Sequence, residues 1–148
     1  MVIGMLIHVK KLNPNAVIPT RGSEFAAGYD LYACLEEPLT IKAGETAKVS
    51  TGLAVEIPEG YAGLVYARSG LATKRGLAPA NKVGVCDSDY RGEYLIFLHN
   101  HSQTDAVVEP GERIAQLIIT PFLEAEFEEA EELSETERGS GGFGSTGR

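Results

Sequence analysis

Glycine and proline recur so often in this chain that its apolar stretches stay short. The 148 residues include 17 glycines and 7 prolines. Between these residues, Leu53, Val55 and Ile57 occupy alternate positions, which is the period of a half-buried strand. Many short strands at a spacing of roughly 8–12 residues are typical of a β-sandwich or barrel. We therefore expect an all-β fold.

Turn-forming residues separate further strand-like segments. Strands are expected at residues 39–42, 61–67 and 113–120, with turns at 43–45, 58–60 and 109–112. A helix is expected only at residues 70–76, and it is short. Residues 84–86 form a small apolar run that enters a turn, so residues 94–98 are the expected return strand of a hairpin.

Length and charge limit the classes of function. A chain of this length fits one domain with a sizeable core. The net charge of −8 argues against general nucleic-acid binding, but a few arginines in one cleft can still attract a small anion. No apolar run approaches the roughly 20 residues of a membrane span, so no membrane association is expected. The first residues lack the features of a signal peptide.

The cysteines and histidines give no sign of a metal centre. Cys34 and Cys86 are too few for a disulfide framework or a zinc cluster, and their apolar neighbours fit buried, reduced thiols. A cytoplasmic location is therefore expected. His8, His99 and His101 lack metal-ligand spacing and are interpreted as surface or hydrogen-bonded histidines.

The composition changes after Pro121. Residues 124–137 are acidic, with Phe127 and Leu133 as their large apolar residues, and residues 138–148 are rich in glycine. Composition alone favours a disordered end or a linker. The alternative is a lid that becomes ordered on binding, because Phe143 is flanked by an arginine and by hydroxyl groups. We accordingly expect a core at residues 1–123 and a C-terminal arm at 124–148.

Two short segments could form parts of a binding site. Asp87 and Tyr90 follow the apolar run at 84–86, so a carboxylate and an aromatic ring would be held at the end of a strand. Arg68, Ser69 and Gly70 stand where a strand gives way to the expected helix, a place that favours phosphate. The alternative for this second segment is a serine N-cap beside an exposed arginine.

Two further polar residues each leave two interpretations open. Asp30, in the segment 26–31, could face a metal ion or its water shell, or it could hold a turn together. Gln116 interrupts an apolar strand, so it needs a hydrogen-bond partner if it points inward. Taken alone, each of these residues is explained more simply by the structural alternative.

In order along the chain, these segments resemble the five motifs of the trimeric dUTPase family. The matching segments are residues 26–31, 67–72, 81–92, 111–117 and 138–147. Each segment is modest alone, but five in series over almost the whole chain are specific. The resemblance outweighs the structural alternatives for the arm and for Arg68 and Ser69.

The resemblance implies a fold, an assembly and a reaction. The fold is a jelly-roll-like β-sandwich or barrel subunit with one short helix and an extended C-terminal arm. The assembly is a homotrimer with three shared sites, each closed by a neighbour's arm. The reaction is the Mg²⁺-dependent hydrolysis of dUTP to dUMP and pyrophosphate, which keeps uracil out of DNA and supplies dUMP for dTMP synthesis.

The resemblance also implies roles for individual residues. Asp87 is the base that activates the attacking water, Tyr90 packs against deoxyribose, and Asp30 contacts the metal through a water. The remaining matches are substrate-binding. Uracil would be bound by the hairpin residues Asn81, Gly84, Val85, Cys86 and Leu95. The phosphates would be bound by Arg68, Ser69, Gly70, Gln116 and Arg138. The arm would add Phe143, which stacks on uracil, and Gly144 and Ser145.

Two rival functions remain to be compared. A dCTP deaminase is similar in parts of the motifs, but it carries a second arginine where this chain has Thr73 and a catalytic glutamate where it has Phe97. A non-catalytic β-sandwich binding module would have lost the site residues, which are all present. At Cys86 the chain departs from the dUTPase pattern, which commonly has a branched aliphatic residue there, so looser packing is expected beneath Asp87.

Overall fold

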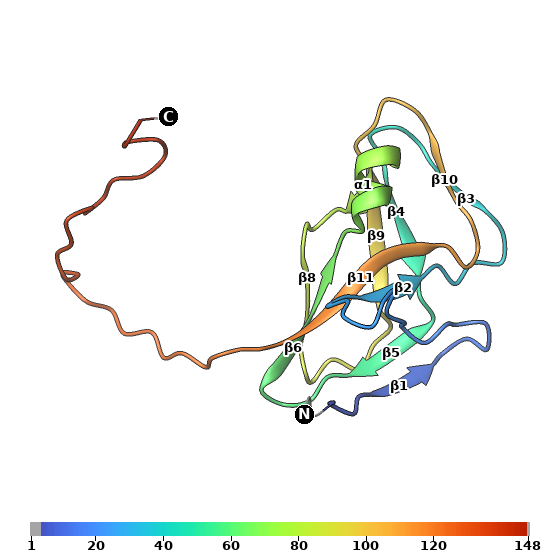
Figure 1. Cartoon of the computed structure of the whole chain (residues 1–148), viewed down its shortest axis with the longest axis horizontal. Helices are drawn as coiled ribbons and strands as arrows, with labels where there is room; N and C mark the ends of the chain where they lie inside the picture. Colours follow the sequence, from blue (N-terminus) through green and yellow to red (C-terminus); the bar gives the residue numbers. More distant parts are fainter. Residues whose placement is uncertain (1–3, 148) are drawn as a thin grey trace.

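The computed structural model describes residues 4–147 as a core of antiparallel strands with a long arm leading away from it (Figure 1). Residues 1–3 of the expected core and Arg148 of the expected arm lie outside the described residues. The elements are β1 (His8–Lys11), β2 (Tyr29–Tyr32), β3 (Leu39–Ile41), β4 (Thr46–Ser50), β5 (Leu53–Glu56), β6 (Tyr61–Tyr66), α1 (Ser69–Arg75), β7 (Leu77–Pro79), β8 (Gly84–Cys86), β9 (Leu95–Asn100), β10 (Ala106–Val108) and β11 (Arg113–Pro121).

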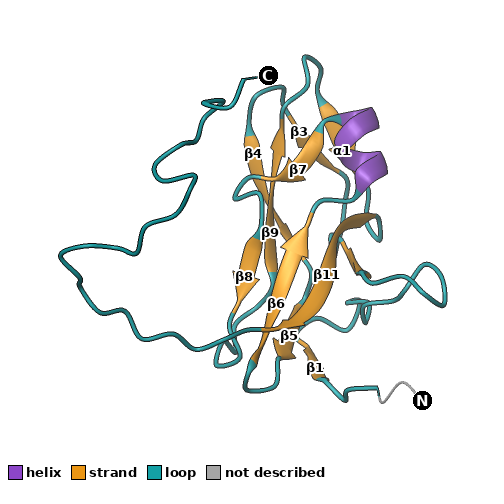
Figure 2. Cartoon of the chain, turned by 60° about the vertical axis from the view of Figure 1, so that its left-hand side comes forward, coloured by secondary structure: helices purple, strands orange, loops and turns teal. Residues whose placement is uncertain are grey.

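The strands form two larger sheets and two ribbons. One sheet has the order β2-β11-β6-β8 and the other has the order β4-β9-β7, while β1 pairs with β5 and β3 with β10. Figure 2 shows β8, β6 and β11 side by side in the first of these sheets. Apolar side chains from both sheets meet in a single buried cluster that includes Leu31, Ile114, Val49 and Leu98. Burying each such side chain contributes about 1.5–3 kcal/mol, so this cluster stabilises the fold. The expected all-β architecture is confirmed.

The turns form where the sequence predicts them. Gly60, between β5 and β6, and Gly111, before β11, have φ angles of 85° and 78°, a region that favours glycine. Each turn is closed by a backbone hydrogen bond, from Tyr61 N to the Pro58 carbonyl (3.1 Å) and from Glu112 N to the Glu109 carbonyl (3.1 Å). The strands that follow these two turns, β6 and β11, pair with each other in the larger sheet.

The short helix begins one residue earlier than expected. Arg68 occupies the N-cap position with extended backbone, Ser69 is the first helical residue, and no side chain caps the helix start. The alternative in which Ser69 is the N-cap is therefore wrong. Gly76 ends the helix in the left-handed conformation (φ 68°), and its N–H donates to the Leu71 carbonyl.

The expected hairpin of residues 84–86 and 94–98 is wrong in its pairing. β8 pairs with β6, whereas β9 lies in the other sheet between β4 and β7. The local sequence signalled a strand, a turn and a second strand, but strand edges distant in the sequence provide the partners. The loop after Cys86 thus crosses between the sheets.

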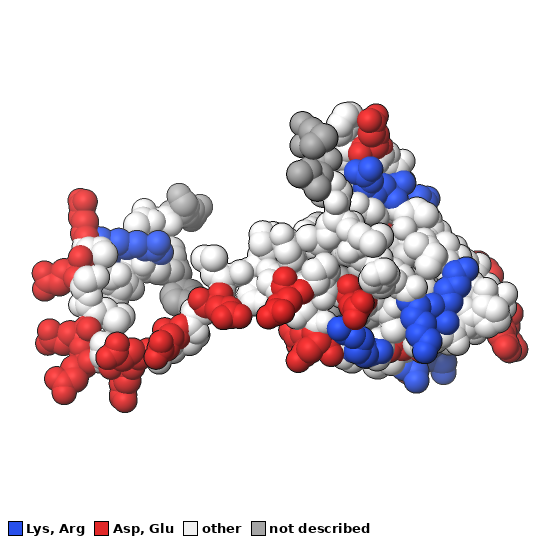
Figure 3. All heavy atoms as spheres, turned by 90° about the horizontal axis from the view of Figure 1, so that it is seen from below, with Lys and Arg blue, Asp and Glu red and all other residues white. Residues whose placement is uncertain are grey.

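The arm leaves the core after β11 and is exposed along its course. The described residues between 122 and 140 are all exposed, and acidic side chains follow the arm (Figure 3). Exposed fractions reach 93% for Leu123 and 95% for Phe127. Among residues 4–147, no helix combines the length and apolar character needed to cross a membrane.

Candidate active site

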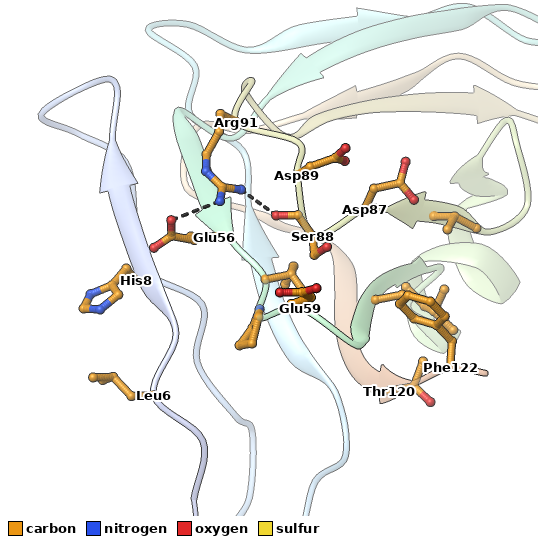
Figure 4. A pocket seen from close by; sticks show the side chains of 15 residues that line it. Leu6, His8, Glu56, Glu59, Asp87, Ser88, Asp89, Arg91, Thr120 and Phe122 are labelled. Atoms are coloured by element: carbon orange, nitrogen blue, oxygen red, sulfur yellow. Dashed lines mark hydrogen bonds and ion pairs between the residues drawn. The ribbon is translucent and has the colours of Figure 1, made fainter. Parts of the chain in front are cut away.

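Asp87 lies at the end of β8, on the wall of an open cavity of about 1090 Å³ (Figure 4). Its side chain is exposed. The wall opposite is formed by residues of β5 and of the turn into β6, including Glu56 and Glu59, and by Phe122 after β11. Water and a ligand could therefore both reach the Asp87 carboxylate.

A second cavity separates the strands that were expected to pair. It has a volume of about 280 Å³ and is lined by Gly84, Val85 and Cys86 of β8 and by Leu95 and neighbouring residues of β9. Within residues 4–147, β8 has a ladder partner only on the side of β6. The N–H and C=O groups on its other edge are therefore free to bind a flat ligand that carries both donors and acceptors.

Tyr90 is fixed beside these two cavities. Its hydroxyl donates to the Glu93 carbonyl (2.8 Å), and its ring stacks on that of Tyr94 with 6.3 Å between centroids. A Cβ on Gly92 would overlap the Tyr90 ring, so glycine is needed for this close approach. The ring is 44% exposed and thus presents a rigid apolar surface to the solvent.

Cys86 and Tyr94 form the floor beneath Asp87 and Tyr90. Burial raises the pKa of the Cys86 thiol, and the Asp87 charge adds to this rise while the Tyr94 hydroxyl opposes it. Burial, together with the neighbouring Cys86, raises the pKa of Tyr94 as well. Both groups are consequently neutral at neutral pH. Tyr94 is 3% exposed, and its ring stacks on that of Tyr90. The looser packing expected beneath Asp87 stays a prediction.

A cluster of charged residues lies at the far end of the same sheet. Arg68 donates through Nε to Oδ1 of Asp30 (2.9 Å), and Nη1 of Arg113 lies 3.7 Å from Oδ2. Because Asp30 binds Nε, the two terminal Nη groups of Arg68 remain available for a phosphate. Ser69 and Gly70 are exposed at the adjoining start of α1.

Gln116 extends this cluster toward the segment that contains Asp30. Its Nε2 donates to the Ala67 carbonyl (2.8 Å), immediately before Arg68. A Cβ on Gly28 would overlap Oε1 of Gln116, so glycine is needed where this side chain approaches the backbone. The side chain of Gln116 is thereby held at the edge of the cluster.

The arm residues lie apart from both groups. Arg138 donates through Nε to the Gly141 carbonyl (2.7 Å), and the Ser145 N–H donates to the Gly142 carbonyl (3.0 Å). Phe143 is fully exposed and, unusually for a non-glycine residue, has a φ of 51°. The arm thus carries a compact turn with an aromatic ring at its surface.

The strand register separates the Asp87 group from the Arg68 cluster. Gly63 lies opposite Cys86, so Asp87 stands level with Ala62, six residues before Arg68. At about 3.3 Å per strand residue, the two backbones are about 20 Å apart. The Arg68 guanidinium also turns toward β2, which β11 and β6 separate from β8. Asp87 and the Arg68 cluster are therefore well separated within one chain.

Several residues near the site were not predicted from the sequence. Arg91, Tyr94 and Arg113 contact expected site residues, and Glu56 pairs with Arg91, but no local signal marked any of the four for these contacts. Arg113 lies within the fourth matching segment, and this position could have drawn attention to it. Phe97, which stands where a deaminase has glutamate, is 48% exposed and offers only hydrocarbon.

The structure offers no dedicated protein cage for a metal. In residues 4–147, no group of three or more His, Cys, Asp or Glu side chains is placed to hold an ion. Asp30, the expected outer-shell residue, faces two arginines instead. This donor set fits an ion such as Mg²⁺ that is bound mainly by ligand phosphates and water.

Comparison with known proteins identifies the family. Residues 14–147 match the family model for dUTPase. The deoxyuridine 5'-triphosphate nucleotidohydrolase of Syntrophotalea carbinolica is 50% identical over 141 residues, covering 95% of this chain and 96% of the relative. That of Psychrobacter sp. (strain PRwf-1) is 45% identical over 150 residues, covering 96% of this chain and 97% of the relative.

Solved structures show the same likeness. A mutant Staphylococcus bacteriophage 80alpha dUTPase with dUpNHpp superposes with a TM-score of 0.87 at 33% identity, covering 97% of this chain and 99% of that chain. A mutant dUTPase from phage phi11 of S. aureus, described for the coordination of a structural Mg(II) ion, gives a TM-score of 0.79 at 27% identity, covering 88% of this chain and 100% of that chain. The expected jelly-roll-like β fold is thus confirmed. The chain belongs to the dUTPase family and is a hydrolase that acts on dUTP.

Proposed function

We propose that the chain hydrolyses dUTP to dUMP and pyrophosphate by attack of a water molecule on the α-phosphorus, with Asp87 as the base. The observation that carries this proposal is the exposed Asp87 carboxylate between an open cavity and the gap that separates β8 from β9. A carboxylate held beside the bound nucleotide can take a proton from the attacking water. The reaction would keep uracil out of DNA and supply dUMP for dTMP synthesis.

The gap between β8 and β9 is the proposed uracil site. Asn81, Gly84, Val85, Cys86 and Leu95 line it, and the free edge of β8 would exchange hydrogen bonds with the donor and acceptor groups of uracil. Cytosine presents a different order of donors and acceptors, so a fixed backbone would leave polar groups unpaired and reject it. Tyr90, fixed from below by Tyr94, would pack against deoxyribose and exclude a 2′-hydroxyl.

Arg68, Ser69, Gly70 and Gln116 are the proposed phosphate-binding residues. The free Nη groups of Arg68 suit phosphate oxygens, and Asp30 orients this guanidinium. Mg²⁺, when bound to the triphosphate, would neutralise charge that develops on the phosphates. The role of Asp30 as an outer-shell contact through water stays a prediction, and the two arginines beside it support an orienting role at least as well.

We propose that the site is completed in a homotrimer. The separation of about 20 Å along the strand between Asp87 and Arg68 supports this assembly, because a neighbouring copy could bring its own Arg68 to Asp87. The core would comprise residues 1–123, and residues 124–148 would form an arm that reaches a neighbour. There Arg138, Phe143, Gly144 and Ser145 would cover the nucleotide.

The start of the arm supports this crossing. Leu123, Ala125 and Phe127 alternate with glutamates, which is the pattern of a strand with one apolar face. Leu123 and Phe127, the large side chains of this face, are exposed in the single chain. β1 pairs with β5 along one edge only, within the described residues, so a copy of this segment could add to its other edge.

The cysteines support the expected cytoplasmic location. Cys34 and Cys86 are both free thiols, and burial raises the pKa of each. Such thiols react slowly and persist in a reducing compartment.

Replacement of Asp87 by asparagine tests the proposed reaction. Asp87→Asn keeps the size of the side chain and removes its ability to accept a proton. Turnover of dUTP should fall by roughly 10²–10⁴-fold, while the affinity for a non-hydrolysable dUTP analogue changes little. Initial rates of pyrophosphate release with Mg²⁺, together with calorimetric titration of the analogue, measure both quantities.

The control for this test is Asp105→Asn, which removes the same charge from an exposed residue of another loop. It should turn over dUTP like the unaltered chain. A near-normal rate in Asp87→Asn would show that another group takes the proton.

A further inference from the structure

Arg91 joins the loop that carries Asp87 and Tyr90 to the β1-β5 ribbon (Figure 4). Its Nη1 donates to the Ser88 carbonyl (2.6 Å) and to the Tyr90 carbonyl (3.2 Å). Its Nη2 lies 3.0 Å from Oε1 of Glu56, in β5. One guanidinium therefore binds the residue after Asp87, the backbone of Tyr90 and a carboxylate on a separate element.

At its far end the loop is attached through Glu93, whose Oε2 accepts from the Gly52 N–H (3.1 Å) and from the Ser50 hydroxyl, and through the Tyr94 N–H, which donates to the Leu53 carbonyl (2.8 Å). A turn is closed by the Tyr90 N–H, which donates to the Asp87 carbonyl (3.2 Å), and the Tyr90 hydroxyl is bound at Glu93. Of these two Tyr90 contacts, the first lies within the loop and the second lies at its far end. Between Asp87 and Gly92, the Arg91–Glu56 pair is the side-chain contact that reaches β5.

The exposure of the pair helps to decide what it does. The side chains of Arg91 and Glu56 are 56% and 49% exposed, and ion pairs this exposed contribute little to folding stability. Their effect on local geometry can nevertheless be large, because a shift of about 1 Å in a reacting group can lower the rate by roughly 100-fold. The pair is therefore better suited to holding the loop in place than to stabilising the core.

We propose that Arg91 is a positioning residue, which holds Asp87 and Tyr90 in their reactive placement by fastening their loop to Glu56. This proposal rests on the proposed roles of Asp87 and Tyr90. The planar fork of arginine is essential to it, since two carbonyl oxygens and a carboxylate are bound from one group. Lysine offers a single ammonium on a flexible stem and would maintain only part of the contact.

The test compares Arg91→Gln, Arg91→Lys and Glu56→Ala with the unaltered full-length chain. The measurements are kcat and KM for dUTP, kcat/KM for UTP, and the midpoint of thermal unfolding. Arg91→Gln should lower kcat for dUTP by about tenfold to a hundredfold, with a smaller change in KM because the uracil-binding edges of β8 and β9 are not altered. The ratio of kcat/KM for dUTP to that for UTP should also fall, because the Tyr90 backbone loses its bond to Arg91, although the side chain keeps its contacts with Glu93 and Tyr94.

Glu56→Ala should produce the same changes to a smaller extent, since Arg91 keeps its two carbonyl contacts. The changes in kcat and selectivity for Arg91→Lys should lie between those of Glu56→Ala and Arg91→Gln. Lys42→Gln removes a positive charge from an exposed turn and should match the unaltered chain. Unchanged kcat and unchanged selectivity in folded Arg91→Gln would overturn the proposal. A loss of kcat/KM that is equal for dUTP and UTP and comes with a lower unfolding midpoint would also overturn it. If the unaltered chain itself released no pyrophosphate from dUTP, the proposed function would fail instead.

Discussion

At the scale of single residues, the candidate site depends on side chains held by neighbours rather than by their own strands. Tyr90 is the clearest case, because the Glu93 carbonyl, Gly92 and the Tyr94 ring each fix a different part of it. A ring held in this way cannot move aside for a bulkier sugar without losing these contacts. Discrimination against ribose should therefore depend mainly on the Tyr90 ring, to which the hydroxyl contributes one of the three contacts that hold it.

Replacement of Tyr90 tests this origin of sugar selectivity. Tyr90→Ala should raise turnover of UTP relative to dUTP by about tenfold or more, since the space for a 2′-hydroxyl opens and packing against deoxyribose is lost. Tyr90→Phe keeps the ring and should keep the preference for dUTP. The ratio of kcat/KM for the two nucleotides is the measurement, and equal ratios in all three proteins would contradict the role of the ring.

A site residue could be predicted from the sequence where its signal comes from neighbours along the chain, and not where its role depends on residues distant in the sequence. Asp87 and Tyr90 could be predicted as candidates because a turn after an apolar run is a local signal. Arg91 and Tyr94 lie in the same stretch, yet their roles depend on Glu56, 35 residues away, and on a floor formed between two sheets. Local patterns carry no information about such partners.

At the scale of elements, the sequence predicts the positions of the turns better than it predicts which strands pair. The turns at Gly60 and Gly111 and the short helix lie where the sequence predicts them, because glycine and proline determine backbone conformation locally. The partner of β8 could not be predicted, since β6 and β9 are both apolar and both within reach. The actual pairing with β6 is what leaves one edge of β8 free for a ligand.

The arm is the element whose role is easiest to separate from folding. Deletion of residues after Glu137 removes Arg138 and Phe143 and leaves every strand intact. The truncated chain should keep its assembly and its unfolding midpoint, while dUTP turnover falls by about a hundredfold or more because water and nucleotide are no longer enclosed. Turnover, light scattering and thermal unfolding of the truncated and full-length chains provide the comparison. Full activity after truncation would show that the arm takes no part in the reaction.

At the scale of the whole molecule, the distribution of the site residues is the main finding. Asp87 lies at one end of the larger sheet and Arg68 at the other, about 20 Å apart along the strand. The arm extends away from both (Figure 1). A single chain therefore holds the expected site residues in three separate places, and the proposed symmetric assembly, in which each site draws on several copies, would bring them together.

Mixing two inactive chains tests this sharing most directly. Asp87→Asn lacks the base but keeps the arm, and the chain truncated after Glu137 lacks the arm but keeps Asp87. The two are unfolded together in equal amounts and refolded, and native mass spectrometry establishes that mixed trimers form. If base and arm come from different copies, about a quarter of the sites in a random mixture regain both, and dUTP turnover returns to a similar fraction of that of the unaltered protein. If mixed trimers form and turnover stays at the level of the separate variants, base and arm act within one chain, and the shared site is contradicted.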